Sequence, residues 1–345
     1  MIKAAVMGAT GYAGAELVRL LSGHPEAEIV FLASHSYAGR KFSDIYPGMR
    51  TVCDITLSDD DIAKAASSGA DVLFLALPAG LASSYVTPAL LDRMKVIDLG
   101  ADYRLHSADT YSAWYRTEHH SSELLAEAVY GLVEIHRDEI RGRRLVANPG
   151  CYTTCSILTL YPLVRDGLID PDTIVIDAKS GTSGAGRSEK LGSLFCEVNE
   201  NFKAYGVATH RHTPEIEQEL SAAAGRDIVL QFTPHLVPMN RGILATCYAK
   251  LRPGVSDDDV ARAYSMYKDE PFIRLVDGSP ETRYVKGTNT VDIGWRIDSR
   301  TGNIIAMGAI DNLGKGAAGQ AVQNMNLLFG LDERTGLQIA AGSPF

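Results

Sequence analysis

The chain opens with MIKAAVMGATGYAGAELVRLL, residues 1–21, and this stretch decides the expected fold. The apolar run Ile2–Met7 has the character of a buried strand, and Ala15–Leu21 has the periodicity of an amphipathic helix. A glycine-rich turn separates them, an order typical of a dinucleotide-binding βαβ unit. Glycines let the backbone approach a pyrophosphate, and the helix start favours its negative charge. A plain tight turn is the alternative. The candidate cofactor contacts in this turn are Gly8, Thr10, Gly11, Tyr12, Ala13 and Gly14.

The residues after the next apolar run bear on which nicotinamide cofactor is bound. Ile29–Ala33 ends in Ser34-His35-Ser36, without the acidic residue that binds the ribose 2′-hydroxyl of NAD. Two basic residues follow closely and suit the 2′-phosphate of NADP, although a solvated basic loop explains the same charges. The sequence therefore favours NADP. The candidate contacts here are Ser34, Ser36, Arg40 and Lys41.

Short apolar runs continue through the first half of the chain in the rhythm of a parallel sheet, as at Val72–Leu77, Val96–Leu99 and Leu145–Ala147. After Pro149 a helix is followed by longer strands and glycine-rich loops. We expect an α/β protein with a Rossmann-type NADP-binding domain and an α+β catalytic and oligomerisation domain on a mixed or antiparallel sheet. The strands expected in the second half are Ile174–Lys179, Ile228–Thr233, Ile243–Leu251, Val291–Trp295 and Ile304–Met307, with a helix near Asp257–Tyr267.

The last helical pattern, Leu313–Phe329, carries small residues on one face, and we expect it to return to the first domain. The predicted division is residues 1–148 plus 313–345 for the NADP-binding domain, and residues 149–312 for the catalytic and dimerisation domain. A length of 345 residues favours two domains on its own.

Composition excludes several classes of function. A formal net charge of −9 disfavours a nucleic-acid partner, because neutralising phosphates requires a basic face. The sequence contains no signal-like start and no run of about 18 apolar residues, so we expect a cytoplasmic protein without membrane contact. Five scattered cysteines fit thiols in a reducing compartment. Cys151 and Cys155 lack a second pair at zinc-like spacing, so we expect no metal site.

Cys151 is the candidate nucleophile. It follows the expected strand Leu145–Ala147 and a Pro-Gly break, and the residues from Tyr152 onward have a helical pattern. A cysteine at a helix N-terminus has a lowered thiol pKa, because the helix dipole stabilises the thiolate. Most cysteines are buried and inert, but this context favours a nucleophile. We expect Cys155, one turn further on, to serve packing.

A thiolate requires a group that handles protons, and two histidines precede a predicted helix. His210 and His212 lie just before Thr213 and Pro214, which we expect at the N-cap and first position of that helix. Either histidine is a candidate to face the cysteine, with His235 as a weaker third. A solvated turn histidine is the alternative for each of them.

Two further segments suit an anion. Lys179–Arg187 combines glycines, hydroxyls and two cations, a composition that grips anions through backbone and side chains together. Arg104, at the end of Asp98–Arg104, offers a bidentate contact to a carboxylate or phosphate. A flexible loop and a surface ion pair are the respective alternatives.

Taken together, these segments resemble the N-acetyl-gamma-glutamyl-phosphate reductase family of arginine biosynthesis, within the aspartate-semialdehyde dehydrogenase superfamily. The match runs nearly from end to end, and several motifs in the right order are far more specific than any one of them. The segments that carry it are Gly8–Gly14, Asp98–Arg104, Asn148–Thr154, Lys179–Arg187, His210–Glu215, Phe232–Gly242 and Asn312–Gln320.

The resemblance implies specific roles for residues in these segments. Cys151 matches the family's nucleophile and His210 its acid/base residue. Further cofactor contacts are expected at Ser183, Gly184 and Asn312. The substrate-binding residues that it implies are Arg104, Asn148, Lys179, Ser180, Arg187 and Arg211.

The activity that the resemblance implies is NADPH-dependent reduction of N-acetyl-L-glutamyl 5-phosphate to the 5-semialdehyde through a Cys151 thioester. A homo-oligomer, either a dimer or a tetramer, is expected. One alternative is a reductase of the aminoadipyl phosphate of lysine biosynthesis, since one methylene changes binding by only about 1 to 3 kcal/mol. The other is a non-catalytic NADP-binding sensor, because a fold does not guarantee chemistry.

Overall fold

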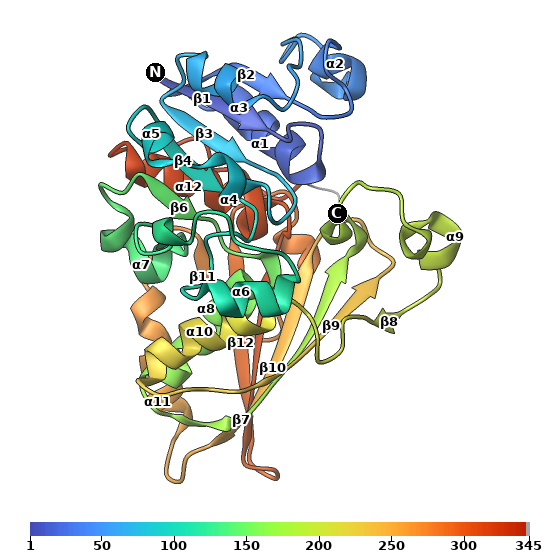
Figure 1. The fold of residues 1–345 in the computed structure, drawn as a ribbon. Coiled ribbons are helices and arrows are strands. Elements are labelled where there is room, and N and C mark those ends of the chain that lie inside the picture. The colour runs from blue at the N-terminus through green and yellow to red at the C-terminus, as the bar shows by residue number, and fades with distance from the viewer. Residues whose placement is uncertain (343–345) are drawn as a thin grey trace. The chain divides into compact units, whose positions relative to one another are not determined.

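The computed structural model describes residues 1–342, and the chain divides into two compact units. The first unit contains Met1–Pro149 together with Ala317–Ile339. The second contains Gly150–Gly316 and residues 340–342. Each unit has its own sheet (Figure 1).

The first unit is built on a six-stranded parallel sheet in the order β2-β1-β3-β4-β6-β5. Strand order reverses between β1 and β3, so the carboxyl ends of these two strands form the switch point at which open α/β sheets bind ligands. The strands are β1 Ile2–Met7, β2 Ala27–Ala33, β3 Val72–Leu75, β4 Lys95–Asp98, β5 Val129–Tyr130 and β6 Leu145–Ala147. The helices are α1 Tyr12–Ser22, α2 Phe42–Ile45, α3 Ile62–Ser67, α4 Ala82–Tyr85, α5 Pro88–Leu91, α6 Ala108–Tyr115, α7 Val133–Ile140 and α12 Gly319–Leu328.

Buried amide side chains fix α12 in the first unit. Gln320 Nε2 and Asn324 Nδ2 both donate to the carbonyl of Gly131, at 2.7 and 2.9 Å. Asn326 Nδ2 donates to the carbonyls of Glu333 and Thr335. Because buried amides cost free energy unless they are hydrogen-bonded, these contacts specify how the helix docks. The single helix predicted at Leu313–Phe329 is wrong in one respect: a π-helical turn, Gly314–Ala318, precedes α12.

The second unit is built on a seven-stranded mixed sheet in the order β11-β12-β13-β10-β7-β9-β8. Its strands are β7 Ile169–Gly181, β8 Lys203–Ala204, β9 Gln231–Val237, β10 Ile243–Leu251, β11 Ile273–Leu275, β12 Val291–Asp298 and β13 Asn303–Ile310. Its helices are α8 Cys151–Arg165, α9 Phe195–Val198, α10 Thr213–Ala224 and α11 Asp257–Tyr264. The predicted fold class, with one parallel and one mixed sheet, is confirmed.

Helix α8 covers one face of this sheet. A Cβ at Gly308 of β13 would collide with Thr159 Oγ1 and lie 3.2 Å from Cys155 Sγ, so α8 packs directly on that strand. Gly308 is in register with Ala245 of β10, which pairs with Ala178 of β7. Since side chains alternate along a strand, the even-numbered residues of β7 near Ala178 face α8 and their neighbours face the other side.

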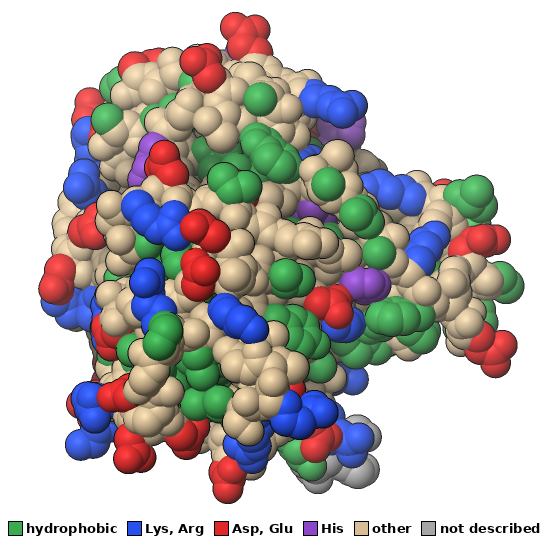
Figure 2. Space-filling view, turned by 90° about the horizontal axis from the view of Figure 1, so that it is seen from below, with side chains coloured by type: hydrophobic (Ala, Val, Ile, Leu, Met, Phe, Trp, Pro, Cys, Tyr) green, Lys and Arg blue, Asp and Glu red, His purple; other side chains and the backbone are tan. Residues whose placement is uncertain are grey.

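The surface gives no broad area of one charge on the face shown in Figure 2, where basic and acidic side chains are interspersed. Within residues 1–342, none of the helices combines the length and the apolar character that crossing a bilayer requires.

Candidate active site

The glycine turn of the first unit is shaped by close backbone packing. Gly8 has a φ of +74°, and a Cβ there would collide with the carbonyl oxygen of Ala76, just beyond β3. A Cβ at Gly14 would collide with the carbonyl oxygen of Gly8 and lie 2.9 Å from Ala9 Cα. Gly11 is the N-cap of α1 and has no side chain to occupy the helix start. The turn therefore has the steric form that fits a pyrophosphate at a helix N-terminus.

A hydroxyl pair ties the glycine turn to the end of β2. Thr10 Oγ1 and Ser34 Oγ are hydrogen-bonded at 2.6 Å and both residues are buried. Ser34 stands where an NAD-binding protein has its acidic residue. Ser36, Arg40 and Lys41 follow on the exposed surface, and the Arg40 guanidinium carbon lies 5.8 Å from the Tyr37 ring centroid.

Cys151 is the first residue of α8, after Gly150 as N-cap, and its side chain is half-buried. A Cβ at Gly316 of the π-helical turn would lie 2.8 Å from Cys151 Cβ, so this turn presses its backbone against the cysteine. Cys155 lies within the packed face of α8. Burial raises the pKa of its thiol to about 12, so Cys155 is protonated at neutral pH.

His210 lies in an aromatic cluster of the second unit. Its ring centroid is 5.3 Å from that of Phe232, 5.6 Å from Tyr152 and 5.4 Å from Tyr205. Burial, and then the charge of Arg211, lower the pKa of His210 to about 4. The ring is therefore neutral at pH 7.

A backbone contact fixes the tautomer of that neutral ring. The N–H of His212 donates to His210 Nδ1 at 3.2 Å. Because Nδ1 accepts, the proton of the neutral imidazole is on Nε2. His212 lies in the same cluster, 4.8 Å from His210 between ring centroids, so both predicted histidines are brought together.

Two tyrosines of this cluster were not found from sequence. Tyr205 donates to the hydroxyl of Tyr152 at 3.2 Å, and Tyr152 donates to the carbonyl of His235 at 3.0 Å. Burial raises the pKa of both phenols well above its usual range, so both remain protonated. Tyr152 could have been considered from sequence, because it directly follows Cys151. Tyr205 could not, because only the folded chain brings it next to Tyr152.

Helix α10 begins one residue earlier than predicted. Thr213 is its first residue and His212 its N-cap, so Pro214 occupies the second position. Both histidines still precede the helix.

His235 and Lys179 are paired across β9 and β7. The two residues are in register on β9 and β7, on the sheet face opposite α8, because Lys179 alternates with Ala178. Lys179 Nζ is 2.6 Å from Asp177 Oδ2, and His235 Nδ1 is hydrogen-bonded to the carbonyl of Ala178 at 3.3 Å, with Asp177 Oδ1 3.1 Å away. His235 also stacks on Phe202. Both side chains lie on the sheet face opposite α8, and their predicted roles stay predictions.

Of the predicted residues, Ser183 and Gly184 lie in the turn Thr182–Ala185, and Asn312 is hydrogen-bonded to Ser183. Asn312 Nδ2 donates to Ser183 Oγ at 2.9 Å, while Asn312 Oδ1 accepts from the N–H of Gly242 at 2.8 Å. Ser183 Oγ in turn donates to the carbonyl of Asn240. A Cβ at Gly184 would lie 2.9 Å from the hydroxyl of the buried Ser180. Arg187, half-buried, follows this turn.

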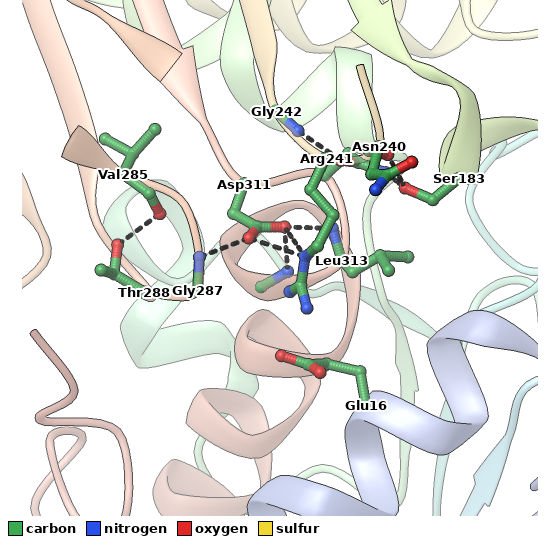
Figure 3. Close-up of polar contacts among 12 residues, drawn as sticks. Glu16, Ser183, Asn240, Arg241, Gly242, Val285, Gly287, Thr288, Asp311 and Leu313 are labelled. Atoms are coloured by element: carbon green, nitrogen blue, oxygen red, sulfur yellow. Dashed lines mark hydrogen bonds and ion pairs between the residues drawn. The ribbon is translucent and has the colours of Figure 1, made fainter. Parts of the chain in front are cut away.

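A fully buried carboxylate, Asp311, organises the chain beside this turn (Figure 3). Its oxygens accept from the N–H groups of Gly287, Leu313 and Gly314, at 2.6, 2.8 and 3.1 Å. They also bind Arg241 Nε at 2.9 Å. Asp311 thereby fixes the start of the π-helical turn that reaches Cys151. The sequence alone does not indicate this role of Asp311, because its partners come from three separate segments of the chain.

Arg104 and Asn148 are brought together in the first unit. Arg104 is only 7% exposed, and it donates through Nε to the carbonyl of Asn148 at 2.8 Å and through Nη2 to that of Leu99 at 2.9 Å. Asn148 Nδ2 donates to the carbonyl of Ala317, and its Oδ1 accepts from Asn324. These contacts fix the backbone three residues before Cys151.

Within residues 1–342, no group of three or more His, Cys, Asp or Glu side chains is arranged to hold a metal ion. The five cysteines in that range are thiols rather than disulfides.

Comparisons with known proteins place this arrangement in a family. Residues 3–143 match the family described as semialdehyde dehydrogenase, NAD binding domain, and residues 151–312 match semialdehyde dehydrogenase, dimerisation domain. The chain is similar to solved structures of aspartate semialdehyde dehydrogenases. One is enzyme II from Vibrio cholerae complexed with ASA, with a TM-score of 0.71 and 19% identity over 96% of this chain and 98% of that one. Another is the Candida albicans protein with NADP, with a TM-score of 0.66 and 20% identity over 95% and 98%.

Much higher identity links the chain to two curated proteins, each named N-acetyl-gamma-glutamyl-phosphate reductase. The protein of Lachnospira eligens is 58% identical and that of Lachnoclostridium phytofermentans 52% identical, with all of both chains covered in each case. The resemblance recognised from the motifs is confirmed. The chain belongs to the N-acetyl-gamma-glutamyl-phosphate reductase family, on the semialdehyde dehydrogenase fold.

Proposed function

We propose that this protein catalyses the NADPH-dependent reductive dephosphorylation of N-acetyl-L-glutamyl 5-phosphate to N-acetyl-L-glutamate 5-semialdehyde, in arginine biosynthesis. The observation that carries the proposal is the half-buried Cys151 at the start of α8, in one unit with the half-buried neutral His210. Full-length relatives at 51–58% identity bear the glutamyl name, so the aminoadipyl and sensor alternatives are not favoured.

Cys151 acts as the nucleophile. Its position at the first turn of α8 places the thiolate at the positive end of the helix dipole. The sulfur attacks the acyl carbonyl carbon, the bond to the phosphate oxygen breaks, and inorganic phosphate leaves with that electron pair. The product of this half-reaction is a thioester on Cys151.

His210 acts on the oxygen of the tetrahedral species. Its neutral ring carries the proton on Nε2 and can donate it as a hydrogen bond without placing a full positive charge in the buried cluster. A proton that passes from Nε2 to this oxygen returns to the same nitrogen when the thiohemiacetal collapses to the aldehyde and the thiolate. His212 is the second candidate for this role, since it lies against His210.

The cofactor fits the first unit. NADPH, when bound, supplies the hydride that reduces the thioester. We assign the pyrophosphate to the turn Gly8–Gly14, including Thr10, Tyr12 and Ala13, and the 2′-phosphate to Ser34, Ser36, Arg40 and Lys41. Ser183, Gly184 and Asn312 are proposed as further cofactor contacts, since Asn312 is hydrogen-bonded to the turn that contains the other two.

The substrate carries a phosphate and a carboxylate, and two arginines belong to the same unit as Cys151. Arg211 is adjacent to His210, and Arg187 follows the turn that Asn312 holds. We assign them to the two anionic groups of the substrate, because a guanidinium matches both groups bidentately. Arg104, Asn148 and Ser180 are retained as proposed substrate contacts.

Association with further copies belongs to the proposal. The match of residues 151–312 to a dimerisation domain supports oligomerisation, and we propose a homo-oligomer, either a dimer or a tetramer. Five cysteines kept as thiols fit the reducing cytoplasm that we propose as its location.

The experiment that tests the function is reduction of NADP by N-acetylglutamate semialdehyde, with and without inorganic phosphate. We expect turnover only when phosphate is present, because phosphate must attack the thioester in the reverse direction. The aminoadipate homologue, run beside it, should have a lower kcat/KM. Phosphate-independent turnover would contradict acyl-phosphate chemistry, and equal or better use of the longer homologue would contradict the chain length.

A further inference from the structure

Glu215 connects the helix that carries the nucleophile with the segment that carries the histidines. It is the third residue of α10, 1% exposed, and its Oε1 accepts from the N–H of Gly150 at 2.9 Å. The same oxygen accepts from Thr153 Oγ1 at 2.8 Å. Both donors belong to the N-terminus of α8, on either side of Cys151.

These contacts replace a cap that α8 cannot provide itself. In a capping box, the carboxylate of the third helical residue accepts from the N-cap N–H. Here the third helical residue is Thr153 and the N-cap is Gly150, which has no side chain. The carboxylate comes instead from Glu215 of another helix. The cap is thus supplied across two helices, and the N-cap position beside the nucleophile stays clear of side-chain atoms.

The hydroxyl groups of Thr153 and Thr154 can satisfy both Glu215 and the carbonyl of Gly150. The carbonyl of Gly150 accepts from Thr153 Oγ1 at 2.6 Å and from Thr154 Oγ1 at 3.0 Å. Because Thr154 also serves that carbonyl, the single hydroxyl proton of Thr153 can be shared with Glu215.

The backbone of Glu215 belongs to the first turn of α10, and this turn is hydrogen-bonded to His210. The N–H of Thr213 donates to the carbonyl of His210 at 3.0 Å, and Pro214 restricts the first turn of α10. Only four residues separate His210 from Glu215, so a displacement at the start of α10 moves the histidine and the cap of α8 together.

The carboxylate of Glu215, at the N-terminus of α8, makes the Cys151 thiolate harder to form. Its negative charge opposes formation of the Cys151 thiolate, because a like charge disfavours the charged form. A buried charge that works against thiolate formation points to a role in geometry.

We propose that Glu215 is a positioning residue that sets the orientation of Cys151 relative to His210 by capping α8 from α10. This inference rests on the proposed function, in which both residues act on one carbonyl group.

The test compares Glu215→Gln and Thr153→Val with Glu217→Gln as matched control. Glu217 lies on the same helix and accepts from the N–H of Leu230, away from α8. Glu215→Gln keeps an acceptor oxygen but replaces two charge-assisted hydrogen bonds by weaker neutral ones. We expect the less firmly held N-terminus of α8 to lower kcat about tenfold or more, with KM changed by less than about twofold. Thr153→Val, which removes one of the two bonds, should lower kcat about three- to tenfold. Glu217→Gln should retain kcat within about twofold.

The second readout is the pH dependence of Cys151 alkylation by iodoacetamide, followed on the Cys151 peptide because Cys196 is exposed and would react too. Loss of the charge in Glu215→Gln should move the thiol titration to lower pH, a shift that a merely structural role would not produce. Full kcat in Glu215→Gln, or a loss matched by an equal fall in folded protein, would overturn the proposal. If the wild-type protein showed no reductase activity, the proposed function would fail by itself. The alkylation profile would then still decide on Glu215, and an unmoved profile would overturn the inference.

Discussion

The backbone N–H of His212 donates to Nδ1 of His210 at 3.2 Å, and this bond determines which ring nitrogen of His210 carries the proton. Nε2 is then the nitrogen that can donate toward a substrate. Burial and the neighbouring Arg211 keep the ring neutral, so the proposed donor is an uncharged imidazole.

The first prediction concerns the titration of His210. Its pKa is lowered from 6.5 to about 4, so its NMR titration should have a midpoint near pH 4. The folded state then binds fewer protons than the unfolded chain between these values, and the contribution of His210 to stability is lost as pH falls from about 6.5 to about 4. Arg211→Gln should raise the midpoint. A midpoint at or above 6.5 in the wild-type protein would contradict this account of the cluster.

The second prediction separates the two histidines. His210→Asn should lower kcat about a hundredfold to ten-thousandfold, the range that general acid–base catalysis contributes. His212→Asn should have a smaller effect, because the backbone of His212, which the substitution retains, makes the contact to Nδ1. Steady-state kinetics on both variants checks this. The reverse ranking would transfer the proposed role to His212.

The third prediction concerns cofactor choice. Arg40→Gln should raise the Kd for NADPH about tenfold or more and leave the Kd for NADH nearly unchanged, because only NADPH has the 2′-phosphate. Arg50→Gln, an exposed arginine in the same unit, is the control and should change neither value. Fluorescence titration gives both constants. Equal weakening of the two cofactors by Arg40→Gln would remove Arg40 from the phosphate site.

The fourth prediction concerns the π-helical turn. Gly316→Ala would place a Cβ only 2.8 Å from Cys151 Cβ, so the turn or the cysteine must move. We expect kcat to fall about tenfold or more and stability to fall by about 1 to 3 kcal/mol. Gly192→Ala, whose Cβ would have only the Lys203 ammonium within 4 Å, should be nearly silent. Kinetics and urea unfolding check both. A fully active Gly316→Ala protein would show that the close approach is dispensable.

Several parts of this site can be predicted from sequence, because they depend only on the order of neighbouring strands, turns and helices along the chain. Gly8–Gly14 and Cys151 each follow a strand and begin a helix, so the chain itself places them at a helix N-terminus. Strand β10 has the predicted bounds, Ile243–Leu251, because its apolar alternation is unbroken. In these cases the neighbouring residues alone contain the information.

Other parts of the site depend on contacts between distant segments. Glu215, Asp311 and Tyr205 act through partners that only the folded chain brings near. The ion pair of Lys179 with Asp177, on the sheet face opposite α8, likewise depends on strand alternation and register rather than on the composition of the loop that follows. The start of β9 was placed at Ile228 and lies at Gln231, since the ladder partners of a strand decide where it begins.

The central claim is that Cys151 forms a thioester with the substrate, and trapping that species tests it most directly. The protein is mixed with N-acetylglutamyl phosphate without NADPH, quenched in acid and analysed by mass spectrometry, with Cys151→Ala in parallel. The account predicts a gain of one N-acetylglutamyl group on the Cys151 peptide of the wild-type protein and none in the variant, which should also lack turnover while binding NADPH normally. Substantial reductase activity in Cys151→Ala, or acylation at another residue, would contradict it.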